Sequence, residues 1–211
     1  MKKGFLVSFE GGEGCGKSTQ IKKFSAYLTE KGVDFVLVRE PGGTEVGEKI
    51  RQILLHDKAE LSPETEFLLF SASRSKLIAD VVKPALAAGK VVVMDRYFDS
   101  SFAYQGFAGK LDIKDIEKIT KFAIGDGAVP DLTFLLDLSY DDGMKRKSAD
   151  ENLQNLDRIE QKGKAYHDRV REGYLQLAAK NKKRFYVVDA LKSPDEVFEN
   201  IIQEFERRYK K

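Results

Sequence analysis

One glycine-rich stretch near the N-terminus constrains this chain more than any other feature. Its residues match G-x-x-x-x-G-K-[ST], the phosphate-binding loop. Glycines let the backbone turn tightly and bring bare N–H groups against a polyphosphate, while the lysine meets the β- and γ-phosphates and the following hydroxyl holds Mg²⁺. The stretch therefore predicts nucleotide-phosphate contacts from Gly11, Gly12, Glu13, Gly14, Cys15, Gly16, Lys17, Ser18 and Thr19.

The segments on either side of the loop fit this interpretation. Residues 4–9 form a short apolar run that is typical of a buried strand. Residues 19–31 carry Ile21, Phe24 and Leu28 at helical spacing, and such a helix directs its N-terminal N–H groups at an anion. A glycine turn that binds nothing is the alternative, and the agreement of the motif with both flanks disfavours it.

Composition limits the class of protein. A chain of 211 residues with 33% charged and 42% hydrophobic residues is typical of one soluble globular domain, here residues 1–211. A net charge of +2 gives no global field that favours nucleic acid, and no apolar run reaches the length of a membrane span. The lone Cys15 permits no internal disulfide, which suits a reducing compartment and predicts a cytoplasmic protein.

Apolar runs alternate with helical patterns along the whole chain. Further strands are predicted at 33–38, 90–95, 130–137 and 184–188, and helices at 46–55, 62–82, 112–124, 156–179 and from 193 onward. This alternation predicts an α/β fold in which a five-stranded parallel sheet carries helices on both faces. In such sheets, ligands bind at the carboxyl ends of the strands.

Polar side chains follow two of the predicted strands. Arg39 begins the turn R-E-P-G-G-T, where it either meets an anion or caps the strand, and turn chemistry leaves both interpretations open. The third strand ends in Asp95 and Arg96, at the expected crevice. Tyr97, Ser100, Ser101 and Tyr104 then repeat at helical spacing, and a face this polar suggests a ligand wall.

Phe70 and Arg74 lie four residues apart in the predicted helix 62–82 and therefore share one face. An aromatic plane beside a guanidinium could stack on a base and bond its edge. The alternative places Phe70 in the core and lets Arg74 reach out to water, and the spacing by itself favours this alternative.

A highly charged segment, roughly residues 141–158, separates the fourth strand from the next helix. It is either a short lid that carries cations over the phosphates or an exposed helical hairpin.

Several stretches together resemble the thymidylate kinase family of bacterial type, in the family's order and over nearly the whole chain. These are residues 9–19, R-E-P-G-G-T at 39–44, Phe70 with Arg74, D-R-Y at 95–97, A-Y-Q-G at 103–106, P-D-L-T at 130–133 and L-D-R-I-E at 156–160. The turn at 39–44 and the late D-R-I-E are the most specific.

The resemblance implies a P-loop NTPase fold and transfer of the γ-phosphate of ATP to dTMP, giving dTDP and ADP on the path to dTTP, with Mg²⁺ and in a homodimer. It implies that Lys17, Arg96 and Arg158 act in catalysis and that Arg146 joins the loop in binding ATP. It assigns dTMP to Glu10, Arg39, Phe70, Arg74, Arg96, Ser101, Tyr104 and Gln105. The implied metal contacts are Ser18, Glu10 and Asp95.

One departure concerns the lid. Relatives with a glutamate at the position of Glu13 usually carry several lid arginines, whereas this segment is mostly Lys, Ser, Asp, Glu and Asn. Arg146, Lys147 and Arg158 are its candidates for the lid cation, and Arg158 has the best motif match.

The implied reaction needs no dedicated base. The second pKa of a phosphate monoester is about 6, so the acceptor is already mostly a dianion near neutral pH and can attack directly. This agrees with a chain whose two histidines, His56 and His167, lie outside the motifs.

Two other functions remain open at the level of sequence. The first is another P-loop kinase that acts on a nucleoside or a different monophosphate, since base choice depends on few contacts. The second is a GTP-dependent switch or an ATP-driven motor. A GTPase would show a late N-K-x-D signature, and N-K-K-R at 181–184 lacks the aspartate.

Overall fold

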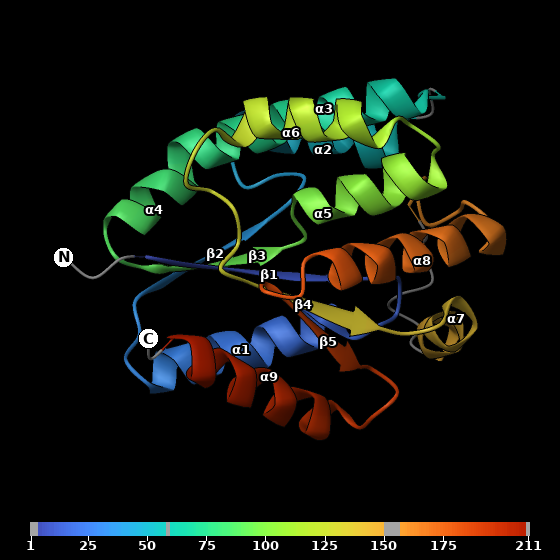
Figure 1. Ribbon diagram of the computed structural model, residues 1–211. Coiled ribbons are helices and arrows are strands. Elements are labelled where there is room, and N and C mark those ends of the chain that lie inside the picture. Colours follow the sequence, from blue (N-terminus) through green and yellow to red (C-terminus); the bar gives the residue numbers. More distant parts are fainter. Residues whose placement is uncertain (1–3, 58–59, 150–156, 210–211) are drawn as a thin grey trace.

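The computed structural model describes residues 4–57, 60–149 and 157–209. Its centre is a five-stranded parallel sheet in the order β2-β3-β1-β4-β5, with helices on both faces (Figure 1). The strands are β1 Phe5–Gly11, β2 Phe35–Arg39, β3 Val91–Asp95, β4 Leu132–Asp137 and β5 Phe185–Asp189. The predicted fold class is confirmed. Because the chain order reverses next to β1, the crevice outside its carboxyl end is the expected ligand site.

Helices form two layers around the sheet. In Figure 1, α1 and α9 cover one face, and α2 to α6 with α8 cover the other. The α-helices are α1 Lys17–Glu30, α2 Glu45–His56, α3 Pro63–Leu77, α4 Lys83–Ala87, α5 Phe98–Ser101, α6 Ile113–Ile124, α7 Tyr140–Ser148, α8 Lys164–Lys180 and α9 Pro194–Tyr209. Two π-helical segments, η1 Ile78–Val82 and η2 Phe102–Ala108, follow α3 and α5.

Two helix predictions differ from the structure. The helix predicted at 62–82 changes to π geometry at η1 and continues as α4, beyond its predicted end. The helix predicted from 156 begins only at Lys164. The Asp157 side chain explains this delay, because it accepts hydrogen bonds from the N–H groups of Ile159 and Glu160 at 2.9 Å each and so competes with helical pairing.

The core between the sheet and the α1/α9 layer is aromatic. Phe24 of α1 packs against Phe9 of β1 and Phe205 of α9, with ring centroids 5.4 and 4.8 Å apart. Burying rings from three elements fixes α1 against β1 and therefore fixes the loop that joins them. Within the described residues, no helix is long and apolar enough to cross a membrane.

Candidate active site

Two cavities meet at the carboxyl ends of β1 and β3. The first, which we call the α3 cavity, measures about 390 Å³. It gathers predicted residues from five parts of the chain: Glu13, Lys17, Ser18, Arg39, Phe70, Arg74, Asp95, Arg96, Ser101, Tyr104 and Gln105. The second, the loop cavity, measures about 480 Å³ and is lined by residues 12–19 and Arg146. Glu13, Lys17, Ser18 and Glu160 line both cavities, so the two form adjoining halves of one site.

The glycine-rich loop turns directly from β1 into α1. Gly14 and Gly16 have φ angles of 68° and 86°, which side chains disfavour. Gly16 is the N-cap of α1 and makes no side-chain cap, so the first N–H groups of the helix remain available to an anion. A Cβ on Gly14 would lie 2.2 Å from the carbonyl oxygen of Gly143, which brings α7 against the loop.

Lys17 and Asp95 form an ion pair of 3.0 Å across the junction between the cavities. The Asp95 atom in this pair is the buried Oδ1, which has no partner other than the Lys17 ammonium within the described residues. Asp95 and the Ser18 hydroxyl both line the α3 cavity and are oxygen ligands of the type Mg²⁺ prefers. The described residues contain no group of three or more His, Cys, Asp or Glu side chains placed to hold a metal ion by themselves, which fits an ion that takes its other ligands from nucleotide phosphates and water.

Glu10 is placed behind the cavity wall. Its carboxylate accepts hydrogen bonds from the N–H of Tyr97 at 2.7 Å, from Ser100 at 2.7 Å and from the Tyr174 hydroxyl at 2.8 Å. Burial and the nearby Asp99 raise the pKa of Glu10 to about 7. Glu10 lines neither cavity, so the direct metal and dTMP contacts predicted for it receive no support from this position.

Arg96 has a φ of 63°, an uncommon angle for a residue with a side chain and one that often marks a functional site. Its guanidinium donates to the Gly11 carbonyl at 2.9 Å and to Glu13 at 2.8 Å. Burial by itself would raise the pKa of Glu13, but the Arg96 and Lys17 cations lower the pKa to about 2. Arg96 is therefore held at the junction by a fully ionised partner.

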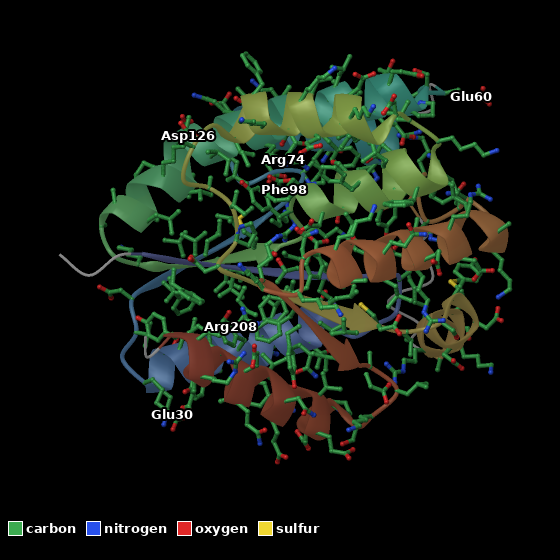
Figure 2. All side chains as sticks on the ribbon, in the orientation of Figure 1. Glu30, Glu60, Arg74, Phe98, Asp126 and Arg208 are labelled. Carbon is green, nitrogen blue, oxygen red and sulfur yellow. The ribbon has the colours of Figure 1, made fainter. Side chains whose placement is uncertain are left out.

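Arg74 is buried in the layer between α3 and the sheet (Figure 2), with only 1% of its surface exposed. Its Nε donates to Glu40 at 2.8 Å and one Nη to Ser101 at 3.0 Å. The other Nη is buried and has no partner within the described residues. The interpretation in which Arg74 reaches out to water is wrong, and half-buried Phe70 lies beside it in the cavity lining.

Glu40 is the buried partner of Arg74. Burial raises the pKa of Glu40 to about 7, although the adjacent Arg74 cation acts in the opposite direction. Glu40 lies inside the R-E-P-G-G-T motif, but the motif by itself assigns no role to it, because its contact with Arg74 of α3 forms only in the folded chain.

Arg39 lies at the rim of the α3 cavity, where its exposed guanidinium pairs with Glu48 at 3.0 Å. Glu48 also accepts from the N–H of Gly43 at 2.9 Å, so it ties the arginine to the turn that follows β2. These contacts fit both interpretations of Arg39. The side chain lines the α3 cavity, where it could meet an anion, and through Glu48 it also stabilises the turn that follows β2.

The described part of the predicted lid comprises α7 and residues 157–158, and residues 150–156 lie outside the described chain. Arg146 donates to the carbonyl of Ala190 at 2.7 Å and Lys147 pairs with Glu160 at 2.6 Å, and both cations line the loop cavity. Arg158 lines neither cavity. Its guanidinium donates to the Leu54 carbonyl and to Glu66, and neither of these residues lines a cavity.

Several lining residues were missed by the sequence analysis. Glu40, Pro41, Asp157, Ile159 and Glu160 lie inside quoted motifs, so that signal could have found them. No sequence signal marks the other lining residues, because they belong to ordinary amphipathic helices or to loops near the C-terminal end of the chain. They are Arg51, Leu55, Gln20, Ala190, Lys192, Pro194 and Val197.

Comparison with known proteins identifies one family throughout. Residues 9–201 match the family model described as thymidylate kinase. The chain is 43% identical to the thymidylate kinase of Chlorobium luteolum over 97% of this chain and 98% of that protein. It is 42% identical to the thymidylate kinase of Kosmotoga olearia, with 95% and 94% covered.

A solved structure agrees with these sequence relatives. The crystal structure of thymidylate kinase from Ehrlichia chaffeensis superposes with a TM-score of 0.77 and 31% identity. The match covers 96% of this chain and 99% of that one, so the two proteins share the fold over nearly their whole length.

Proposed function

We propose how the described residues divide the work of phosphoryl transfer, on the premise that this chain belongs to the thymidylate kinase family and transfers the γ-phosphate of ATP to dTMP. One observation supports the assignment of the two cavities to the two nucleotides: Phe70 and the buried guanidinium of Arg74 both line the α3 cavity. We assign this cavity to dTMP and the loop cavity to ATP.

Recognition of the base falls to Phe70 and Arg74. Phe70 is half-buried and offers a ring face for stacking. One Nη of Arg74 is a buried donor that finds no acceptor among the described residues, and a carbonyl at the edge of a pyrimidine would satisfy it. Ser101, Tyr104 and Gln105 complete the wall around the nucleoside.

We assign binding of the acceptor phosphate to Arg39 and Arg96, whose guanidinium groups extend from the ends of β2 and β3. Arg39 pairs with Glu48 and Arg96 pairs with Glu13. A phosphate dianion takes over part of that pairing and attacks the γ-phosphorus without a protein base. Neither His56 nor His167 lines a cavity.

On the ATP side, the loop amides and Lys17 hold the phosphates, and Arg146 lies where it can contact the nucleotide. Mg²⁺ is the proposed metal, held by Ser18 and Asp95, and it would neutralise charge that develops on the transferring group. The ion pair with Asp95 holds the Lys17 ammonium at the junction of the two cavities, where it can contact the β- and γ-phosphates.

A panel of nucleoside monophosphates tests the assignment. ADP production would be measured with ATP and each of dTMP, dUMP, dCMP, dAMP and dGMP in turn. We expect turnover with dTMP to exceed turnover with the purine and cytosine nucleotides by about 10²-fold or more, since a mismatched base leaves Arg74 unpaired. Acceptor-independent hydrolysis of equal rate would instead indicate a nucleotide switch.

A homodimer is proposed on the α2, α3 and α6 layer. Phe122 of α6 is 91% exposed, and Leu68 of α3 and Ile53 of α2 are 55% and 41% exposed. Apolar side chains this exposed on neighbouring helices fit the isologous contact of a second copy. Light scattering would report a dimer for the natural chain and a monomer for Phe122→Lys, whereas a monomeric natural chain would refute the proposal.

Two further assignments remain proposals. We place the enzyme in the cytoplasm, where a lone buried Cys15 would stay reduced, and fractionation of cells would test this. We also treat residues 1–211 as one domain with the lid at about 141–158, which predicts a single cooperative unfolding transition.

A further inference from the structure

Glu66, near the N-terminus of α3, is a fully buried carboxylate that lines neither cavity. Its Oε1 accepts from Arg158 at 2.7 Å and from Lys162 at 2.9 Å, and its Oε2 accepts from Gln105 at 3.3 Å. A buried charge persists only where partners compensate for the lost hydration. Both cations come from residues 157–163, the connection into α8, which we call the strap.

Arg158 fastens the strap to a second helix as well. Its Nε and one Nη donate to the Leu54 carbonyl at 3.0 and 2.9 Å, near the C-terminal end of α2. The last carbonyls of a helix lack partners within the helix and attract cations, so this is a favourable place for a guanidinium. The Arg158 side chain therefore contacts α2 and α3 at the same time.

The neighbours of Arg158 face the site. Asp157, Ile159 and Glu160 line the α3 cavity, and Glu160 also lines the loop cavity. Glu160 pairs with Lys147 of α7 at 2.6 Å, and burial together with the nearby Glu13 carboxylate raises the pKa of Glu160. Holding Arg158 outward therefore sets the position of a carboxylate that lies between the two cavities.

The Glu66 carboxylate is also connected to the proposed base pocket through a neighbouring residue. Glu66 lies one helical turn before Phe70, and Gln105, its third partner, lines the α3 cavity. The strap and the pocket for the base consequently share one buried anchor, and movement of either one disturbs the hydrogen bonds of the other.

We propose that Glu66 is a positioning residue that, through Arg158 and Lys162, clamps the strap onto the dTMP pocket and so places Glu160 between the two nucleotides. Arg158 is then part of this clamp instead of the cation that meets the transferring phosphate. The inference rests on the proposed assignment of the two cavities.

The first measurement needs no substrate. Hydrogen exchange of backbone amides in peptides covering 157–163 would be compared between the natural chain, Glu66→Gln and Arg158→Gln. We expect exchange in the strap to accelerate on the order of tenfold in both variants, while α1 and α9 keep their protection. Glu45→Gln, which removes the carboxylate of an exposed ion pair on α2, is the matched control and should change nothing.

The second measurement is a double-mutant cycle on turnover. Each single variant should lower kcat/KM for dTMP on the order of tenfold, and the double variant should lose no more than either single one, because both break one clamp. If Glu66→Gln folds poorly, Lys162→Met removes one cation only and should give a smaller effect of the same kind.

Two results would overturn the inference. One is unchanged exchange of the strap in both variants. The other is a loss of kcat in Arg158→Gln that exceeds the loss in Glu66→Gln about 10²-fold or more, as expected for an arginine acting on the phosphoryl group. Absence of dTMP phosphorylation by the natural chain would refute the proposed function instead, and the exchange data would still test the clamp.

Discussion

The two cavities are built by different means. The loop cavity is lined largely by the glycine-rich loop and by two cations of α7, whereas the lining of the α3 cavity includes buried side chains that pair with one another. Backbone amides recognise phosphate, which every nucleoside triphosphate carries. A buried guanidinium with one donor that lacks a partner in the described chain is suited to distinguish base edges. Under the proposed assignment, selectivity is expected mainly from the α3 cavity and charge neutralisation mainly from the loop.

The largest effect is expected from Lys17→Met, at the junction of the cavities. This variant removes the ammonium that contacts the β- and γ-phosphates and should lower kcat by about 10³-fold or more. The circular dichroism spectrum and melting temperature should stay close to those of the natural chain, because Lys17 is not part of the core. Near-normal turnover would refute the assignment of the loop.

A substitution at the contact between α7 and the loop should come next. A Cβ on Gly143 would lie 2.1 Å from the Glu13 carbonyl oxygen, so Gly143→Ala must push α7 away from the loop. Because small misplacements are costly in phosphoryl transfer, we expect kcat/KM for ATP to fall by about 10²-fold. Gly163→Ala is the control, since no atom lies within 4 Å of its added Cβ.

On the α3 side, Phe70→Ala should weaken dTMP binding much more than ATP binding. Stacking of a base on an aromatic ring contributes about 1–3 kcal/mol, which corresponds to roughly tenfold to a hundredfold in affinity. Titration calorimetry with each nucleotide would measure the two losses separately. Equal losses for both nucleotides would mean that Phe70 serves the core and that the cavities differ less than we infer.

The smallest effect concerns the pH dependence of stability. Burial raises the pKa of Glu40 from 4.5 to about 7, so the folded state binds this proton more tightly than the unfolded state does. The resulting stability is complete below about pH 4.5 and is lost as the pH rises through 7. The Glu40→Gln variant has no such proton to lose. The melting temperature of the variant minus that of the natural chain should therefore increase by about 5 °C between pH 5 and pH 7.5.

The matched control for this measurement is Glu45→Gln, whose carboxylate is exposed. The difference in melting temperature between this variant and the natural chain should not change over the same pH range. A pH-independent difference for Glu40→Gln would show that Glu40 stays ionised beside Arg74.

The sequence by itself determined the sheet and the phosphate loop. Spacing within single segments was enough, because the turn from β1 into α1 and the apolar runs of the strands depend on neighbouring residues. The family was confirmed, and the comparisons leave neither rival function standing.

Only the tertiary structure decided what Glu10, Arg74 and Arg158 do. Each carries a charge, and the chain order does not say which distant group compensates that charge after burial. Glu40 pairs with Arg74 in the interior, Tyr174 donates to the buried Glu10, and Glu66 holds Arg158 outside both cavities. Local pattern fixes backbone form, whereas the orientation of a buried charge depends on contacts that only the completed fold provides.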